Sequence, residues 1–189
     1  MSYEFRILAL FVFIAIMLIF DLRNPPDKRF RFKTYWFILS LGGVGALLGM
    51  AIDSITSRIS IDYFIYGKGL LAGSMLKRDI LALGAKAGFS AGVFAGCFLI
   101  MANPLKQHVI HLYRFISIPL LISVLLGFLL GAIQYATNIV FLDQVSFLGE
   151  DHSRLFATVW LIHIGVYLGA LLGLLLVCHR VRTLGINRS

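Results

Sequence analysis

The sequence predicts an all-α integral membrane protein with about five transmembrane helices. Three observations lead to this fold class: the composition, five long apolar stretches, and glycines at four-residue intervals within those stretches. Of 189 residues, 59% are hydrophobic and only 14% are charged, whereas a soluble domain has about 45–50% apolar and about 25% charged residues. The surplus apolar surface must face lipid or neighbouring membrane helices. We therefore expect one polytopic membrane domain over residues 1–189.

The spans follow from the length of the apolar stretches. A hydrocarbon core about 30 Å thick is crossed by about 20 apolar residues in a helix. The candidate spans cover approximately residues 5–20, 35–52, 80–102, 115–140 and 155–178. Adjacent prolines at 25 and 26 stop the first span, because proline cannot continue a helix. That span lacks a clear signal-peptide cleavage site, so we expect it to remain in the protein.

Basic residues flank the apolar stretches and predict the orientation. Arg6 stands at the start of the first span, which is followed by a basic segment containing Arg23, Lys28, Arg29, Arg31 and Lys33. The positive-inside rule then predicts an outside amino terminus and an inside carboxyl terminus, in the inner membrane of a bacterium. The net charge of +8 comes from these flanks, which suit anionic lipid headgroups, and we expect no nucleic-acid partner.

The only long connection covers residues 53–79. Between Ile55 and Tyr63, apolar and polar residues alternate with a period of two, which predicts a short half-buried strand. From Leu70 to Leu83, apolar residues surround a charged group, which predicts an amphipathic helix at the membrane interface. A membrane-lying connector and a lid or binding element are both open interpretations of this insertion.

The connection begins with a motif. Residues 53–64 read DSITSRISIDYF and follow directly after an apolar stretch. This string resembles a D-x-[IV]-T-x-x-[IV]-S-x-[DE]-Y-F stretch in a group of uncharacterised bacterial membrane proteins with a similar layout. The resemblance implies no catalytic role. It implies that a set of motif residues acts together at the outer mouth, or that the set stabilises a loop: Asp53, Thr56, Ser60, Asp62, Tyr63 and Phe64.

Glycine spacing is the strongest pattern in the chain. Residues four apart share a helical face, and a face of glycines lets another helix approach closely. The third span carries Gly84, Gly88, Gly92 and Gly96, and the fifth carries Gly165, Gly169 and Gly173. Shorter versions occur as Gly45 with Gly49 and as Gly127 with Gly131. The pattern predicts Gly-zipper packing, either within one subunit or between copies.

Polar residues within the spans are candidates for a transport pathway, because a polar group in lipid is costly. The candidates are Lys86, Ser90, Gln134, Asn138 and His163. Two of them also have a purely structural explanation. Lys86 lies close enough to the membrane edge to extend its amine to the headgroups. His163 can form a hydrogen bond to a neighbouring helix.

Several kinds of site are not indicated by the sequence. It contains no nucleotide-binding glycine loop, paired-histidine zinc helix or nucleophile elbow, so we predict no catalytic residue, cofactor or metal. The two cysteines, Cys97 and Cys178, are expected to be buried and unpaired.

The function we predict is a small channel-like or transport-type protein for an ion or small solute. It would contact membrane lipids and either self-associate or bind another membrane protein. A non-catalytic scaffold or regulatory subunit of a larger membrane complex is the first alternative. The second is an interfacial lipid-modifying enzyme that uses Asp53, Asp62, His108 or His111.

Overall fold

The computed structural model consists of helices and connecting turns. It describes residues 8, 12, 14–16, 19, 22–23, 30–103, 109–140 and 143–186. The long helices are α2 (Phe30–Ile59), α3 (Leu76–Met101), α4 (Ser117–Thr137) and α5 (Glu150–Ile186). Short helical turns, η2 (Tyr63–Gly67), η3 (Val109–Phe115) and η4 (Asp143–Leu148), lie in the connections. Within the described ranges there is no β-strand.

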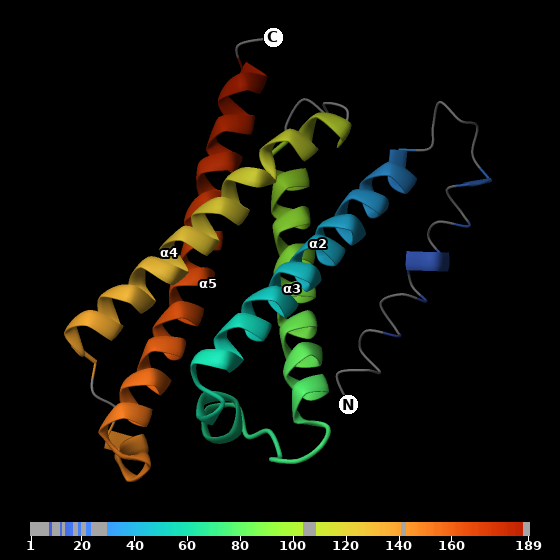
Figure 1. Ribbon diagram of the computed structural model, residues 1–189. Helices are drawn as coiled ribbons and strands as arrows, with labels where there is room; N and C mark the ends of the chain where they lie inside the picture. The colour runs from blue at the N-terminus through green and yellow to red at the C-terminus, as the bar shows by residue number, and fades with distance from the viewer. Residues whose placement is uncertain are drawn as a thin grey trace.

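The helices form two hairpins that lie side by side (Figure 1). In the first, α2 packs chiefly against α3. Their closest approach is at glycines: a Cβ atom added to Gly45 would overlap the carbonyl oxygen of Gly88, and one added to Gly49 would overlap that of Gly84. No side chain larger than hydrogen fits between the backbones at these points.

The second hairpin pairs α4 with α5. An added Cβ at Gly165 would lie 2.7 Å from the Cα of Gly127, and one at Gly169 would lie 2.6 Å from the carbonyl oxygen of Ile122. Both distances are too short for a real Cβ contact, so α5 also packs on its partner through positions without side chains. The same device therefore occurs in both hairpins.

An apolar cluster joins the hairpins at each end. The cluster at the end of the bundle that contains the α5 carboxyl terminus comprises Phe37, Leu41, Leu99, Leu112, Phe115, Leu174, Val177 and Val181. The cluster at the opposite end comprises Tyr63, Phe64, Ile80, Val145, Phe156 and Val159. Each cluster draws residues from both hairpins, so the space between the hairpins is bounded by packed side chains at its two ends.

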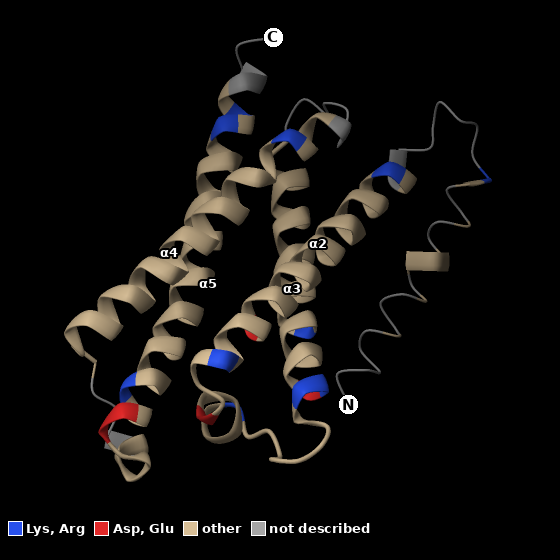
Figure 2. Ribbon diagram, viewed as in Figure 1, with Lys and Arg blue, Asp and Glu red and all other residues tan. Residues whose placement is uncertain are grey.

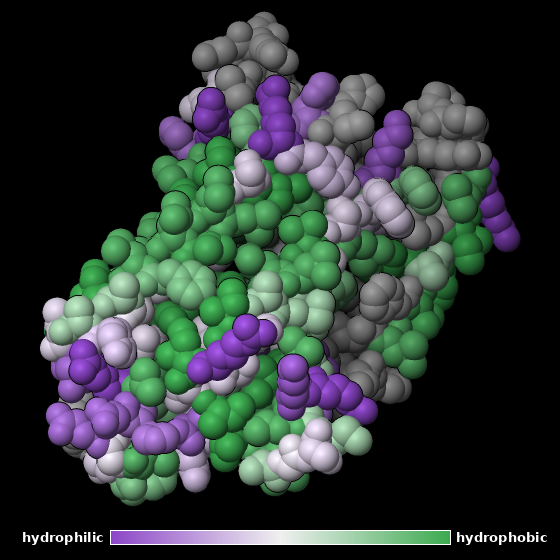
Figure 3. All heavy atoms as spheres, in the orientation of Figure 1, coloured by the Kyte–Doolittle hydropathy of each residue, from purple (hydrophilic) through white to green (hydrophobic). Residues whose placement is uncertain are grey.

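The outer surface is that of a membrane protein. Four described helical segments are long and apolar enough to cross a bilayer: Phe32–Ile59, Leu76–Met101, His111–Thr137 and Glu150–Thr183. Their middle portions expose large apolar side chains, including Leu47, Phe94 and Leu125. Charged residues gather towards the two ends of the bundle (Figure 2), and a green apolar band lies between them in the space-filling view (Figure 3). This distribution matches a hydrocarbon core with a headgroup region on each side.

The predicted spans 35–52, 80–102, 115–140 and 155–178 correspond to these four segments. The first predicted span, residues 5–20, falls largely outside the described residues. Of its positions, 8, 12, 14–16 and 19 are described, and these are helical. The described helices are mostly longer than the apolar stretches, because their ends carry polar residues beyond the hydrocarbon core.

The predicted strand at 55–63 is wrong. Helix α2 continues to Ile59, and the π-helical turn η2 follows from Tyr63. The buried positions in this segment are Ile52, Asp53, Thr56, Ser60, Tyr63 and Phe64, which recur every three or four residues as they do on one face of a helix. The alternation of apolar and polar residues is real, but the contacts follow the helical period.

The predicted amphipathic helix from Leu70 to Leu83 is also corrected. Residues 70–75 are not helical, and the helix that begins at Leu76 is the start of α3 itself. The charged residues Lys77, Arg78 and Asp79 therefore occupy the first turn of a transmembrane helix. Here they lie beyond the apolar band rather than on a separate interfacial helix.

Candidate functional site

A buried carboxyl–imidazole pair connects the two hairpins. Asp53 belongs to α2 and His163 to α5, and Nε2 of His163 lies 2.9 Å from Oδ1 of Asp53. The two residues are 5% and 8% exposed. Both lie within candidate membrane spans. The contact places two titratable groups in an apolar environment, where each depends on the other for its hydrogen bond.

The hydrogen bond of Nδ1, the second ring nitrogen of His163, determines where the protons of the Asp53–His163 pair lie. Nδ1 of His163 lies 2.8 Å from the carbonyl oxygen of Val159, and because a carbonyl only accepts, Nδ1 carries a hydrogen. If the ring is neutral, Nε2 has none and a protonated Asp53 donates to it; if the ring is charged, Nε2 donates to an ionised Asp53. In both forms the contact holds one proton and the pair is electrically neutral.

Aromatic rings enclose this pair on the side of η2. The Tyr63 ring stacks on the His163 ring with centroids 4.8 Å apart, and Phe64 meets it edge-on at 6.1 Å. Burial raises the pKa of the Tyr63 phenol, and the charges of Tyr167 and Asp53 raise it further. Tyr63 is therefore a neutral phenol that excludes water from the imidazole.

Among the described residues that line the cavity, Lys68 is the charged side chain outside the pair. Its Nζ lies 5.3 Å from the centre of the Tyr63 ring, and Lys68, Asp53, His163 and Tyr167 line the same cavity. These residues come from the α2–α3 connection, from α2 and from α5. Because the Asp53–His163 pair is neutral as a unit, Lys68 supplies the net charge of this end of the cavity.

The motif residues reach the site because α2 is helical here. Asp53 and Thr56 lie within α2, Ser60 and Tyr63 follow its end at Ile59, and all four are buried. The Thr56 hydroxyl donates to the carbonyl oxygen of Ile52. The Ser60 hydroxyl is buried and has no hydrogen-bond partner among the described residues.

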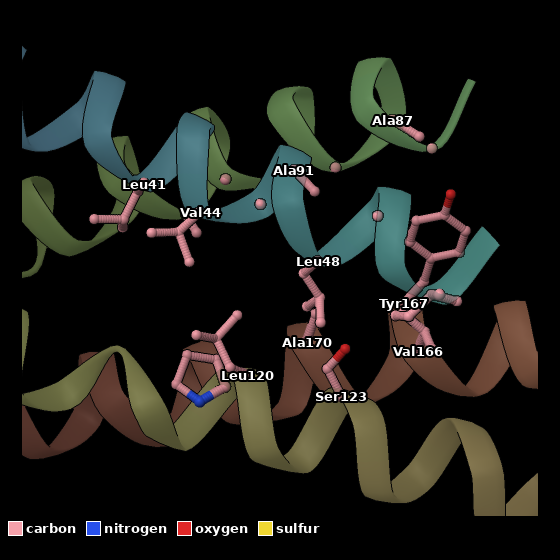
Figure 4. A pocket seen from close by; sticks show the side chains of 18 of the residues that line it. Leu41, Val44, Leu48, Ala87, Ala91, Leu120, Ser123, Val166, Tyr167 and Ala170 are labelled. Atoms are coloured by element: carbon pink, nitrogen blue, oxygen red, sulfur yellow. The ribbon is translucent and has the colours of Figure 1, made fainter. Parts of the chain in front are cut away.

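A cavity of about 170 Å³ extends inward from Asp53 and His163 between the hairpins. Figure 4 shows Leu41, Val44 and Leu48 of α2 on one side, with Leu120 and Ser123 of α4 opposite them. Alanines and glycines of α3 complete the wall. The cavity is thus polar at the Asp53 end and apolar over the rest of its length, with Ser123 as the polar residue furthest from that end.

A second carboxyl–imidazole contact lies nearer the surface. Nδ1 of His152 is 2.8 Å from Oδ2 of Asp62, which joins the α2–α3 connection to the start of α5. His152 is exposed, and an exposed pair of this kind contributes little to stability. The motif aspartates Asp53 and Asp62 thus each contact a histidine of α5, one inside the bundle and one at its end.

The predicted pathway residues do not form one group. Of the five, only His163 lines the cavity. Lys86 is exposed on α3, and the Ser90 hydroxyl donates to the Lys86 carbonyl oxygen. His111 is exposed on η3, whereas His108 lies outside the described residues.

Gln134 and Asn138 close the end of α4 instead. The Gln134 side chain donates from Nε2 to the carbonyl oxygen of Val140 and accepts from its N–H at Oε1. Asn138 has a left-handed backbone with φ of 47° and follows the last helical residue, Thr137. The Gln134 side chain thus holds the Val140 backbone beside the end of α4, and the Asn138 side-chain oxygen accepts from Gln134 Nε2.

Three polar residues of the cavity are not among those predicted from the sequence: Lys68, Ser123 and Tyr167. Lys68 belongs to a connection, and its position over Tyr63 depends on the turn η2. The described residues contain no cluster of three or more side chains suited to a metal ion. Comparison with protein-family models, with curated proteins and with solved structures found no match to this chain.

Proposed function

We propose that this protein is a proton-coupled carrier of a small solute, in which Asp53 and His163 form the proton-binding site. The observation that supports this proposal is the buried contact between Asp53 and His163, which joins the two hairpins beside the cavity. A membrane-buried ionisable pair is costly, and such pairs commonly serve proton or ion movement.

The proposed coupling follows from the single proton in the contact. Nδ1 of His163 is committed to the Val159 carbonyl, so removal of the shared proton leaves the Nε2 lone pair facing an ionised Asp53. The two groups then repel and the hairpins lose a connection. Proton binding therefore favours the joined hairpins, and release of the proton favours their separation at this end.

The apolar clusters at the two ends of the bundle favour a carrier over an open channel. The apolar cluster that contains Tyr63 and Phe64 bounds one end, and the cluster that contains Phe37 and Leu41 bounds the other. Because His163 contacts Tyr63 and Phe64 directly, a change at the proton site reaches the nearer cluster first. Alternating opening of the two clusters would expose the cavity to each side of the membrane in turn.

We further propose that the carboxyl terminus lies inside, in a bacterial inner membrane. Towards the end of the bundle where α5 terminates, the described charged side chains include Lys33, Arg114, Arg180 and Arg182, and no acidic side chain is described there. Asp62, Asp79, Glu150 and Asp151 lie at the other end. This difference supports the orientation given by the positive-inside rule.

The glycine faces support Gly-zipper packing within one copy of the chain. Contacts of Gly45, Gly49, Gly84 and Gly88 are already occupied between α2 and α3. Gly43 has open space beside its Cα, and the exposed apolar residues of the hairpins are available to lipid or to another membrane protein. Self-association would then use these outer faces rather than the glycine grooves.

The test is solute uptake into proteoliposomes under an imposed pH gradient, with a pH-sensitive dye inside. The panel contains inorganic ions, small carboxylates and single-chain amphiphiles. We expect uptake of a panel member together with protons, and loss of the proton-linked component in Asp53→Asn and His163→Gln. Asp79→Asn is the matched control, because it removes a carboxyl group that does not line the cavity.

Two other results would overturn the proposal. Folded protein without flux for the whole panel, together with copurification of another membrane protein that depends on its exposed faces, would indicate a scaffold. Absent flux with a change in liposome lipid composition that Asp62→Asn abolishes would indicate an interfacial lipid-modifying enzyme.

A further inference from the structure

We infer that the cavity binds a single-chain anionic lipid of the lysophospholipid class, with its head at the Asp53 end and its chain between the hairpins. This inference rests on the proposed carrier function and names its substrate class. Three properties of the cavity support it: its shape, its charge, and a buried hydroxyl without a partner.

The shape suits one hydrocarbon chain. Along α2 the lining runs from Leu41 to Asp53, which is about 18 Å at a rise of about 1.5 Å per residue. This length, close to one leaflet of a hydrocarbon core about 30 Å thick, is shared by the linker near Asp53 and the chain towards Leu41. A volume of about 170 Å³ over that length is too small for two chains side by side. Leu41, Leu99 and Leu120 surround the part furthest from Asp53.

The charge of the polar end suits an anionic head. Asp53 and His163 are neutral as a pair because one proton lies between them, and Lys68 adds a positive charge to the same end of the cavity. Asp62 is paired with His152 and does not line the cavity. An ammonium group forms strong hydrogen bonds to a phosphate oxygen, so Lys68 is the expected contact of the head.

The hydroxyl of Ser123 is the expected contact of a second polar group of the ligand. Ser123 is 1% exposed, and its Oγ has no hydrogen-bond partner among the described residues. Figure 4 shows it pointing into the cavity. Its Cα faces Gly169 of α5, six residues from His163 and thus about 9 Å further into the membrane. The linker of a lysophospholipid, with its hydroxyl and ester carbonyl, follows the phosphate at this depth and offers Ser123 a partner.

The experiment measures equilibrium binding of radiolabelled lauroyl lysophosphatidate to the full-length protein in lipid nanodiscs. Competitors are dodecanol, which has the chain without the anionic head, and dilauroyl phosphatidate, which has two chains. We expect saturable binding that neither competitor displaces at equal concentration. Lys68→Gln should weaken binding about tenfold or more, and Ser123→Ala about threefold to tenfold, as losses of single hydrogen bonds. Arg78→Gln, an exposed cation outside the cavity, should bind as the unmodified protein does.

Equal displacement by dodecanol would overturn the inference, because it would show that the cavity binds the apolar chain and does not recognise the anionic head. Displacement by dilauroyl phosphatidate, or binding unchanged in both Lys68→Gln and Ser123→Ala, would also overturn it. The carrier proposal has a separate outcome: if lysophosphatidate binds as expected but no proton-linked uptake occurs, the carrier function fails. If another solute is taken up with protons and lysophosphatidate does not compete, only the substrate class fails.

Discussion

Asp53 and His163 are 110 positions apart in the sequence and 2.9 Å apart in the structure. Each is noticeable in the sequence as a polar group at or within an apolar stretch. Their pairing is not predictable from it, because the contact depends on how two hairpins lie together. Sequence reasoning assigned Asp53 to a loop, and only the continuation of α2 to Ile59 turns its side chain towards α5.

The intramembrane amides Gln134 and Asn138 show another limit of sequence reasoning at this scale. A polar residue near the end of an apolar stretch suits both a pathway and a helix end. The structure gives both a role at the end of α4. Composition does not distinguish these roles, since Gln134 bonds the backbone of Val140 and the Asn138 side chain accepts from Gln134.

Tyr63 provides a residue-scale prediction about pH. Burial raises its pKa above the ordinary value of 10.0, so in the folded protein it keeps its proton where an unfolded chain loses it. The stability that this adds is complete below about pH 10 and is lost as pH rises towards the folded-state pKa. At about pH 11 the tyrosinate absorbance of folded Tyr63→Phe should therefore equal that of the unmodified protein.

Tyr66→Phe is the matched control for this measurement. Tyr66 is exposed. Its removal should therefore lower the absorbance by the contribution of one ionised tyrosine, out of seven tyrosines in the chain. A decrease of the same size in Tyr63→Phe would mean that Tyr63 ionises freely and does not shield the imidazole.

At the scale of elements, apolar length and glycine spacing are the informative parts of the sequence. Four of the five predicted spans coincide with candidate membrane helices. The strand prediction was wrong because a short run of alternating residues satisfies a period of two by composition, whereas the buried face from Ile52 to Phe64 follows the helical period. The lengths of α2, α3 and α5 are underestimated because their polar terminal turns continue past the hydrocarbon core.

Glycine substitution tests the packing of α2 against α3. Gly45 faces the Gly88 backbone, whereas nothing lies near Gly43 two residues earlier on the same helix. Gly45→Ala should destabilise the protein by about 1–3 kcal/mol, as overpacking does. Gly43→Ala should be neutral or stabilise by up to about 1 kcal/mol, because alanine favours helix over glycine.

Unfolding of both variants in mixed micelles with increasing denaturing detergent measures these effects. The comparison is internal, since both variants add one methyl group to α2. Equal stability of Gly45→Ala and Gly43→Ala would show that the α2–α3 backbones do not approach as closely as the structure has them.

For the whole molecule, the arrangement is two tightly packed hairpins with a cavity between them and an apolar cluster at each end. Contacts within each hairpin far exceed those between hairpins, so the hairpins are the natural rigid units of a conformational change. The Asp53–His163 contact is a polar connection between them inside the bundle, and in the proposed mechanism its single proton couples the relative position of the hairpins to pH. This arrangement arises from tertiary packing and cannot be read from periodicity.

The most direct test is the distance between the hairpins as a function of pH. Spin labels at the exposed positions Phe94 on α3 and Leu125 on α4 report it by pulsed electron paramagnetic resonance. The unmodified protein should pass from one distance at low pH to a second distribution as pH rises. Asp53→Asn should remain at the first distance, because the Asn amide donates to Nε2 of a neutral His163 without a shared proton, and Asp53→Ala should show the second distribution at every pH. An unmodified protein whose distance is the same from low to high pH, and equal to that of Asp53→Ala, would contradict the account.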